Sequence, residues 1–409
     1  MSKPIEIFAD NLSSEQAQSL FGQFAGIPER DFINRMQASS SLFEQVEAAS
    51  VWQLMDSLNQ EFAIRAAGMP DMHRGYAMPI GGVVATEDVV VPAWVGYDIG
   101  CGMCAVPTTF SAQEIRAQQD AVFEAIYRHV PTGKKGHAQP VVDPERVLGS
   151  LPSRQLQEIY AQRGGAHACG TLGGGNHFIE LGEAETDGRI WIVLHSGSRG
   201  PGHGTAQHFM ALASGDGRPR EGHHGLRADS PEGRAYISAL DWLLRFALLN
   251  RETMLQQVER ALNAVGLRGE LIFDQMINRN HNHAEQREDG LWVHRKGATH
   301  AEHGMAGVIP GDMEHGSYIV SGLGHEQALR SSSHGAGRRL SRKQAKNMVN
   351  LEAFQERMKQ AGIRARVSEA TLDEAPDAYK GIKAIIAQQV ERGLIEVVEH
   401  VQPIVNIKE

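Results

Sequence analysis

The stretch V-G-Y-D-I-G-C-G-M-C-A-V, residues 95–106, limits the possible folds of this chain more than any other. The apolar run before it, residues 89–95, predicts a buried strand, and the glycines that follow allow a tight turn and a close approach to a ligand. Within this turn lie Asp98 and Cys101, three residues apart, and both side chains can bind a metal ion. Two interpretations remain open from these residues alone: a metal-binding turn at the end of a strand, or a tight turn with one buried cysteine.

The composition is that of an ordinary globular protein with a large core: 409 residues, of which 41% are hydrophobic. Three cysteines in so long a chain do not make a disulfide framework, which indicates a reducing compartment. Neither a signal peptide nor an apolar run long enough to span a bilayer is apparent, so we expect a cytoplasmic protein without a membrane partner. Because the net charge is −9, nucleic acid could bind only through a local basic patch.

Histidine is unusually frequent, with 19 residues, many of them beside glycine. The segment C-G-T-L-G-G-G-N-H-F-I-E-L, residues 169–181, has three consecutive glycines whose N–H groups could hold a phosphate, followed by His177. Residues 190–194 predict an apolar strand that delivers His195 to its end, in H-S-G-S-R-G. With the carboxylate and thiol of the first turn, these two histidines favour a metal site. For most of the 19, solvated surface histidines are the alternative.

Helical spacing of apolar residues predicts helices over 112–130 and from Pro231 to about Ala264. Proline suits the first position of a helix, and the apolar residues of the second segment predict a helix of the core scaffold. Internal repeats and low-complexity linkers are not evident. The chain therefore favours one integrated domain over residues 1–409.

Proline and glycine predict two irregular segments. The first, residues 67–85, is expected to be a structured loop that leads to a strand and contains Asp71 and His73. Its polar residues could belong to a functional site, or they could only stabilise the turns of the loop. The second, residues 201–231, is rich in glycine, histidine and arginine and predicts a long loop.

The densest basic segment of the chain follows a loop of small residues, Ser331–Gly337, which surrounds His334. Its cations, on the expected first turns of a helix, are Arg338, Arg339, Arg342, Lys343 and Lys346. A helix N-terminus behind a glycine loop attracts anions, so this segment favours phosphate binding. A solvated basic helix face is the alternative.

Taken together, these motifs resemble those of the RtcB RNA ligases over essentially the whole chain. The matching signatures, in chain order, are P-D-M-H at 70–73, V-G-Y-D-I-G-C-G at 95–102, G-N-H-F-I-E at 175–180, H-S-G-S-R-G at 195–200, H-N at 281–282, R-K-G-A at 295–298 and S-H-G-A-G-R at 333–338. One glycine motif would be weak evidence. Seven motifs in order, in a chain of matching length, leave little room for chance.

The resemblance implies an α+β fold in a single domain, with β-sheets around a deep metal-lined cleft and flanking helices. It implies an enzyme that joins an RNA end bearing a 3′-phosphate or 2′,3′-cyclic phosphate to one bearing a 5′-OH. The implied cofactors are two Mn²⁺ ions and GTP, and the implied path runs through a guanylylated histidine and an RNA-3′-pp-5′-G intermediate, in RNA repair or tRNA splicing. The natural RNA, the oligomeric state and any activating protein partner stay open.

The family's functional residues carry over where the motifs match. The resemblance implies that two metal ions are held by Asp98, Cys101, His177, His195 and His281, with Cys101 between the ions. It makes His334 the guanylylated histidine, has Asp71 orient it or take part in proton transfer, and has Arg338 hold phosphate groups of RNA ends. The implied nucleotide contacts are Asn176, His177, Phe178, Ile179, Glu180, His281, Asn282, Pro310, Gly311, Asp312, Met313, Ser317, His334, Gly335, Ala336, Gly337 and Lys408.

Two residues depart from the family's pattern. Asp312 stands where the family's P-G-S-M often has serine, and a carboxylate there would repel a triphosphate unless it faces away. Cys104 forms a C-x-x-C pair with Cys101, a spacing seen in redox and zinc sites. Because the chain has no second C-x-x-C, a zinc ribbon is excluded.

The metal and the reaction each have an alternative. One thiolate with three imidazoles ordinarily favours Zn²⁺, so Mn²⁺ rests on the resemblance. A metal-dependent cyclic phosphodiesterase or phosphohydrolase on the same scaffold would open cyclic phosphates without sealing RNA. A non-catalytic module that binds RNA ends is a third hypothesis, and the intact ligand set argues against it.

Overall fold

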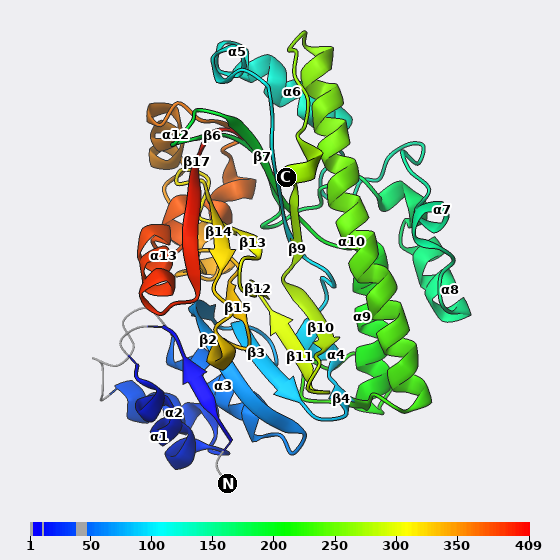
Figure 1. Ribbon diagram of the computed structural model, residues 1–409, viewed down its shortest axis with the longest axis vertical. Helices are drawn as coiled ribbons and strands as arrows, with labels where there is room; N and C mark the ends of the chain where they lie inside the picture. Colours follow the sequence, from blue (N-terminus) through cyan, green and yellow to red (C-terminus); the bar gives the residue numbers. More distant parts are fainter. Residues whose placement is uncertain (1–2, 10–11, 38–46) are drawn as a thin grey trace.

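The computed structural model describes residues 3–9, 12–37 and 47–409. It has the predicted mixed α+β fold, with two large β-sheets surrounded by helices (Figure 1). The first large sheet has the spatial order β1 (Ile5–Ile7), β2 (Ala63–His73), β3 (Ile80–Thr86), β11 (Trp292–Lys296) and β10 (Asn282–Gln286). The small two-stranded sheets pair β12 (Ala298–His300) with β15 (Ser331–Ser333) and β4 (Val89–Val90) with β8 (Leu226–Arg227).

The second large sheet curves until its two ends meet. Its order is β13 (Ala306–Pro310), β14 (Ser317–Gly322), β17 (Ile395–Ile407), β6 (Phe178–Ala184), β7 (Ile190–Ser196), β5 (Gly102–Pro107) and β9 (Ile277–Asn280), with β16 (Arg364–Ala365) beside β17. At the closure, Arg279 Nε on β9 donates to the carbonyl oxygen of Ala306 on β13 at 3.4 Å. The sheet is therefore a nearly closed barrel.

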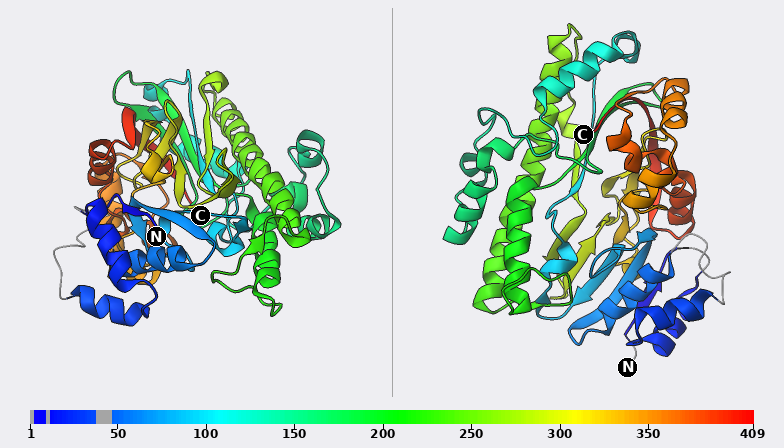
Figure 2. Two further views of the ribbon diagram at one scale, coloured as in Figure 1. Left: turned by 60° about the horizontal axis from the view of Figure 1, so that its bottom comes forward. Right: turned by 180° about the vertical axis from the view of Figure 1, so that it is seen from behind.

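The helices flank these sheets, with α10 along one side and α13 on the other in all three views (Figures 1 and 2). Their bounds are α1 Ser14–Phe24, α2 Glu29–Gln37, α3 Ala48–Asn59, α4 Pro92–Val95, α5 Ala112–Ala117, α6 Gln119–His129, α7 Pro144–Leu148, α8 Arg154–Gln162, α9 Arg199–Ser214, α10 Pro231–Ala264, α11 Arg342–Met348, α12 Leu351–Gln360 and α13 Ile382–Glu391. Short 3₁₀ turns are η1 Gly165–Ala168, η2 Phe273–Gln275, η3 Glu326–Ala328, η4 Glu369–Glu374 and η5 Pro376–Ala378. Among the residues that the structure describes, no helix is long and apolar enough to cross a membrane.

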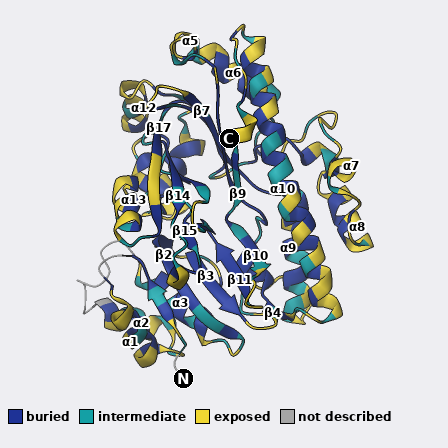
Figure 3. Ribbon diagram, in the orientation of Figure 1, coloured by how far each residue is buried: buried dark blue, intermediate teal, exposed yellow. Residues whose placement is uncertain are grey.

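Helix α10 confirms the predicted core helix, and it begins and ends at the predicted residues. Pro231 occupies its first turn, and the Ser230 hydroxyl accepts a hydrogen bond from the Gly233 N–H at 3.0 Å, which caps the N-terminus. In its first half Trp242 packs edge to face on Tyr160 of α8, with ring centroids 5.5 Å apart, and in its second half Met254 is buried in the core of the barrel sheet. The exposed residues of α10 face outward (Figure 3). One long helix thus joins the two main hydrophobic cores.

The prediction of a loop over 201–231 is wrong in the first half of the segment, which belongs to helix α9. Glycine is a poor helix former, but here close packing explains it. A Cβ on Gly202 would lie 1.8 Å from Ser198 Oγ, and one on Gly204 would lie 2.8 Å from Ile159 Cγ2 on α8. The glycines permit this contact between helices, so tertiary packing overrides local propensity.

Three smaller predictions also need correction. The apolar run 89–95 is not one strand, because Pro92 begins the short helix α4 after the two-residue β4. The segment 67–85 is not mainly a loop: β2 extends to His73, with a shift of register against β3 after Gly68. The helix predicted over 112–130 is interrupted at Gln118, between α5 and α6.

Candidate active site

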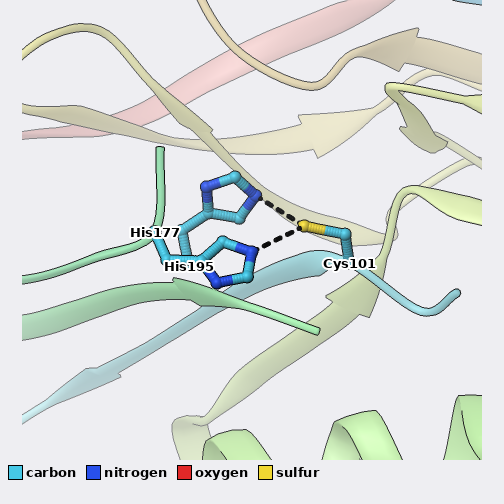
Figure 4. A group of neighbouring side chains, drawn as sticks. All are labelled: Cys101, His177 and His195. Carbon is cyan, nitrogen blue, oxygen red and sulfur yellow. Dashed lines mark hydrogen bonds between the residues drawn. The ribbon is translucent and has the colours of Figure 1, made fainter. Parts of the chain in front are cut away.

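The ends of barrel strands β5, β6, β7 and β9, and the turn after α4, bring a thiol, a carboxylate and three imidazoles together. Cys101 Sγ lies 3.4 Å from His177 Nε2 and 3.0 Å from His195 Nε2, and the three side chains point toward one another (Figure 4). His281 Nε2 lies 3.1 Å from His195 Nε2, and Asp98 Oδ2 lies 2.9 Å from His177 Nε2. All five side chains implied as metal ligands therefore form one cluster.

The imidazoles are oriented by hydrogen bonds on their far side. His177 Nδ1 donates to the carbonyl oxygen of Leu172 at 2.9 Å, and His195 Nδ1 donates to that of Asn176 at 3.1 Å. Nδ1 thus holds a proton in both rings, and Nε2 is directed into the cluster, as in metal-ligating histidines. Carbonyl acceptors thus fix the tautomer that a metal ion requires.

Burial controls the protonation of the cluster. It lowers the pKa of His195 and of His281 well below the usual value, so both imidazoles are neutral at physiological pH. Burial and the neighbouring Asp98 raise the pKa of Cys101, whereas Asp98 has its pKa lowered to about 2, because the hydrogen bond and charge of His177 outweigh its burial. A bound cation would hold the thiol as a thiolate. The donor set fits divalent metal ions.

A buried arginine on α10 ties together the backbone that carries the cluster. Arg251 donates from Nη1 to the carbonyl oxygens of Gly100 and Ser196, both at 2.8 Å. Its Nε and Nη2 donate to the side-chain oxygens of Asn278 and Asn280, both at 2.7 Å. The neighbours of Cys101, His195 and His281 are thereby fixed to one guanidinium group.

We expect Arg251→Met to lower the free energy of unfolding by about 3 kcal/mol or more, because it leaves four buried oxygens without this donor. Urea unfolding measures this change. The control is Arg245→Met on the same helix, whose side chain is 46% exposed and pairs with Asp241, and which should cost less than about 1 kcal/mol. Equal losses in the two variants would contradict a structural role for Arg251.

His334 lies beside the Cys/His cluster and is held by Asp71. Its Nδ1 lies 2.6 Å from Asp71 Oδ2, which also accepts from the His334 backbone N–H at 3.2 Å. Asp71 is fully buried; burial alone would raise the pKa of Asp71, but the charge and hydrogen bond of His334 lower it overall. The rings of His334 and His281 are 4.9 Å apart. An ionised carboxylate therefore fixes the Nδ1–H tautomer and leaves Nε2 free to react.

A cavity with about 880 Å³ of empty space begins at His334 and His195. The residues of its wall that were implied as nucleotide contacts are Asn176, Phe178, Glu180, Pro310, Gly311, Asp312, Met313, His334, Gly335, Ala336, Gly337 and Lys408. Arg338 also lines it. Most of the implied nucleotide residues thus share one cavity next to the Cys/His cluster.

Five implied nucleotide residues do not line this cavity; two of them, His177 and His281, belong to the Cys/His cluster. Ile179 alternates with its neighbours along β6 and packs in the hydrophobic core on the other face. Ser317 is fully buried behind Glu180, and its hydroxyl donates to Glu180 Oε1 at 3.1 Å. Asn282 instead holds backbone, accepting from the Gly297 N–H at 2.8 Å and donating to the Asp98 carbonyl oxygen at 3.2 Å.

The cavity also contains residues that were not implied as nucleotide contacts. They are His73, Ile80, Gly316, Arg342, Glu374, Tyr379 and Asn406. Asn406 stands opposite Glu180 across β17 and β6 and donates to its Oε2 at 3.3 Å. The Arg338 guanidinium lies over the Tyr379 ring, with its Cζ 5.0 Å from the centroid of that ring. The chain around Tyr379 contains no motif that would mark it.

The basic segment is neutralised in part by acids from η4. Arg338 Nη1 lies 3.2 Å from Glu374 Oε1, and Arg342 Nη1 lies 2.7 Å from Asp373 Oδ2 and 2.8 Å from Glu374 Oε1. Lys346 Nζ lies 3.6 Å from Asp373 Oδ1. Helix α11 begins only at Arg342, so Arg338 precedes it. The prediction that Arg338 and Arg339 lie on the first turns of this helix is therefore wrong.

The family described as "tRNA-splicing ligase RtcB" matches residues 53–158 and 148–409. The chain belongs to the RtcB family. The RNA-splicing ligase RtcB of Escherichia coli K12 is 33% identical over 391 residues, which cover 89% of this chain and 95% of that protein. The tRNA-splicing ligase RtcB of Thermococcus kodakarensis is 28% identical over 416 residues, covering 82% and 86%. The RNA-splicing ligase RtcB of Mycobacterium bovis is 29% identical over 423 residues, covering 84% and 97%.

In this member of the RtcB family, the unusual Asp312 is engaged by its own loop. Its Oδ1 accepts from the backbone N–H groups of Glu314 at 2.9 Å and His315 at 3.1 Å. His315 Nδ1 lies 2.8 Å from Oδ2, and this hydrogen bond raises the pKa of His315. The Asp312 side chain is only 4% exposed. Its charge is therefore directed into the loop and compensated there, although the residue lines the cavity.

Cys104, the other departure from the RtcB pattern, is separated from the cluster. It packs in the core with Val106 and Leu194, fully buried. Burial raises the pKa of Cys104 to about 12, so its thiol is protonated and unreactive at neutral pH. Cys101 and Cys104 therefore do not act as a C-x-x-C pair in the folded protein.

Proposed function

We propose that this protein is an RNA ligase that joins an RNA 3′-phosphate or 2′,3′-cyclic phosphate end to a 5′-OH end, using GTP and Mn²⁺. The observation that carries the proposal is the position of His334: its ring is 4.9 Å from that of His281 in the Cys/His cluster, and it lines the adjoining cavity. The names of the relatives, RNA-splicing and tRNA-splicing ligases, support it. RNA repair or tRNA splicing would be its setting.

His334 is the proposed carrier of GMP. Its Nε2 attacks the α-phosphorus of GTP, an N–P bond forms, and the bond to the bridging oxygen breaks as pyrophosphate leaves. A 2′,3′-cyclic phosphate end is first opened by water to a 3′-phosphate. An oxygen of the RNA 3′-phosphate then attacks the phosphorus of the GMP and displaces His334, which gives RNA-3′-pp-5′-G. Finally, the 5′-OH attacks the RNA 3′-phosphorus, the bond to GMP breaks, and the proton of the 5′-OH passes to solvent. Asp71 holds the proton on His334 Nδ1 throughout, which stabilises the positive charge of the phosphorylated ring.

The Cys/His cluster is the proposed site of two Mn²⁺ ions, held by Asp98, Cys101, His177, His195 and His281. When bound, the ions would neutralise charge on the reacting phosphates. A thiolate with three imidazoles also suits Zn²⁺, so manganese rests on the likeness to the family. Arg338, at the cavity wall, would hold phosphate groups of the RNA ends.

Mass spectrometry after incubation with GTP and Mn²⁺ tests the proposal. We expect a mass gain of one GMP on the peptide that holds His334. With RNAs bearing a 3′-phosphate and a 5′-OH, the adduct should be consumed and a joined RNA should appear. No adduct with Mn²⁺, Zn²⁺ or Co²⁺, together with opening of a 2′,3′-cyclic phosphate to an unjoined 3′-phosphate, would identify a phosphohydrolase instead.

Guanosine binding should depend on pH through Glu180, the proposed acceptor for the guanine N–H groups. Burial and the charge of Asp312 raise the pKa of Glu180 to about 8. The hydrogen bonds from Ser317 and Asn406 lower this pKa, but by less. Only the ionised form accepts through both oxygens, so affinity should rise roughly tenfold per pH unit from 6 toward 8 and then level off. Calorimetry of guanosine binding measures it. Glu180→Gln should flatten the profile; an unchanged slope would exclude Glu180 as the titrating group.

A further inference from the structure

One aromatic side chain is exposed on a turn that buried groups hold in place. Tyr76, between β2 and β3, exposes 63% of its surface. The buried Gln53 donates from Nε2 to the carbonyl oxygens of Gly75 at 3.1 Å and Tyr76 at 2.7 Å, and its Oε1 accepts from the Gly75 N–H at 3.0 Å. Ala77 and Met78, which follow, are buried. The turn therefore presents the Tyr76 ring to solvent in a fixed position.

Two further rings support Tyr76 from behind. Its ring meets that of Tyr97 edge to face, with centroids 6.1 Å apart, and Tyr97 stacks on His203 of α9 at 5.2 Å with an angle of 22° between the planes. The three residues Tyr76, Tyr97 and His203 form an aromatic row in which the half-buried Tyr97 lies between two exposed rings.

The aromatic row adjoins both parts of the candidate active site. The turn that carries Tyr76 leaves His73 and returns at Ile80, and both of these residues line the cavity. At the other end, Tyr97 directly precedes Asp98 of the Cys/His cluster. A polymer whose end reaches the cluster would therefore pass the exposed ring within a few residues of that end.

We propose that Tyr76, supported by Tyr97 and His203, is a stacking platform for an unpaired base of the RNA strand whose end enters the candidate active site. The inference rests on the proposed function. Every nucleobase has a flat face that stacks on an aromatic ring, and single-stranded RNA is commonly held in this way.

The surroundings of the row favour RNA over a protein partner. The other large apolar side chains that are exposed in the described residues belong to other segments, so Tyr76 stands alone rather than in an apolar patch. Arg163, whose charge acts on His203, donates to Gln207 Oε1 at 3.0 Å and has no carboxylate partner among the described residues. A guanidinium beside a stacking ring suits a phosphate that follows a base.

The test is the Kd of a short single-stranded RNA with a 3′-phosphate, measured by fluorescence anisotropy. Tyr76→Leu removes the ring and should weaken binding about 5- to 150-fold, since stacking contributes about 1–3 kcal/mol per base. Tyr76→Phe keeps the ring and should bind within about twofold of the unaltered protein. The matched control is Phe273→Leu, another exposed aromatic at 39%, which should leave the Kd unchanged.

RNAs that lack one base at a time then locate the contact. At one position near the end, removal of the base should abolish the difference between Tyr76→Leu and the unaltered protein. Equal affinities on intact RNA, or a difference that persists with every abasic RNA, would overturn the platform. The GMP adduct on His334 is measured in the same preparations: its formation with equal RNA affinities overturns only the platform, and its absence from the unaltered protein overturns only the proposed function.

Discussion

Replacing His334 with alanine is expected to abolish covalent labelling by GTP, with a loss of more than about a thousandfold in the rate of adduct formation. The physical reason is that the two nitrogens of the His334 ring have different roles. Nδ1 is committed to Asp71 at 2.6 Å, so Nε2 is the atom with a free lone pair at the cavity. Intact-protein mass spectrometry and transfer from α-labelled GTP both measure the loss.

The same variant should keep its metal-binding residues, because His334 is not among the five side chains of the Cys/His cluster. Its metal content and melting temperature therefore serve as the internal control. If His334→Ala still carried one GMP, another nucleophile would have to be sought, with His73 the nearest stacked ring at 6.4 Å. Such labelling would sink the assignment of His334.

The second large effect is expected for Cys101→Ala. Its sulfur is the atom that both His177 and His195 face, at 3.4 and 3.0 Å, so its removal leaves the two halves of the cluster without a shared ligand. We expect the affinity for Mn²⁺ to fall by about 100-fold or more and ligation to be lost. Calorimetric titration of metal-free protein and elemental analysis after gel filtration measure the binding.

The chain supplies a matched control for that experiment in Cys104→Ala. This cysteine is three residues away and equally buried, but it packs in the apolar core and not in the cluster. The variant should bind metal like the unaltered protein and lose only the stability of a small core truncation, about 1 kcal/mol. Equal metal losses in both variants would mean that folding, not coordination, was disturbed.

The sequence placed Asp98 and Cys101 in a glycine-rich turn and His195 at a strand end, and these residues do meet in the Cys/His cluster. His281 was named only through the resemblance to the family. Helix α10 could also be predicted from the sequence, since its apolar residues recur at helical spacing from Pro231 to Ala264. The assignment of residues 1–409 to one domain, and the roles of the individual site residues, stay predictions.

The remaining features depend on contacts between distant segments. Nothing local to Glu374 or Asp373 signals that they neutralise Arg338 and Arg342, because the partners are 31 to 36 residues apart and meet only in the fold. Helix α9 was missed for a related reason: its glycines matter through packing against α8, which local propensity does not contain. Ile179 shows that a motif does not tell which face of a strand a residue occupies.

The placement of Cys104 has a consequence for how the newly made chain meets metal ions. Before β5 forms, Cys101 and Cys104 are two thiols at the spacing of a zinc chelate, whereas Asp98 and His281 are separated by nearly half of the chain. Pairing of β5 with β7 and β9 withdraws one thiol into the apolar core and turns the other toward the imidazoles. A cation that bound the chain before β5 paired would therefore meet two sulfurs, whereas the folded protein offers one sulfur with imidazoles and a carboxylate, a donor set of different metal preference.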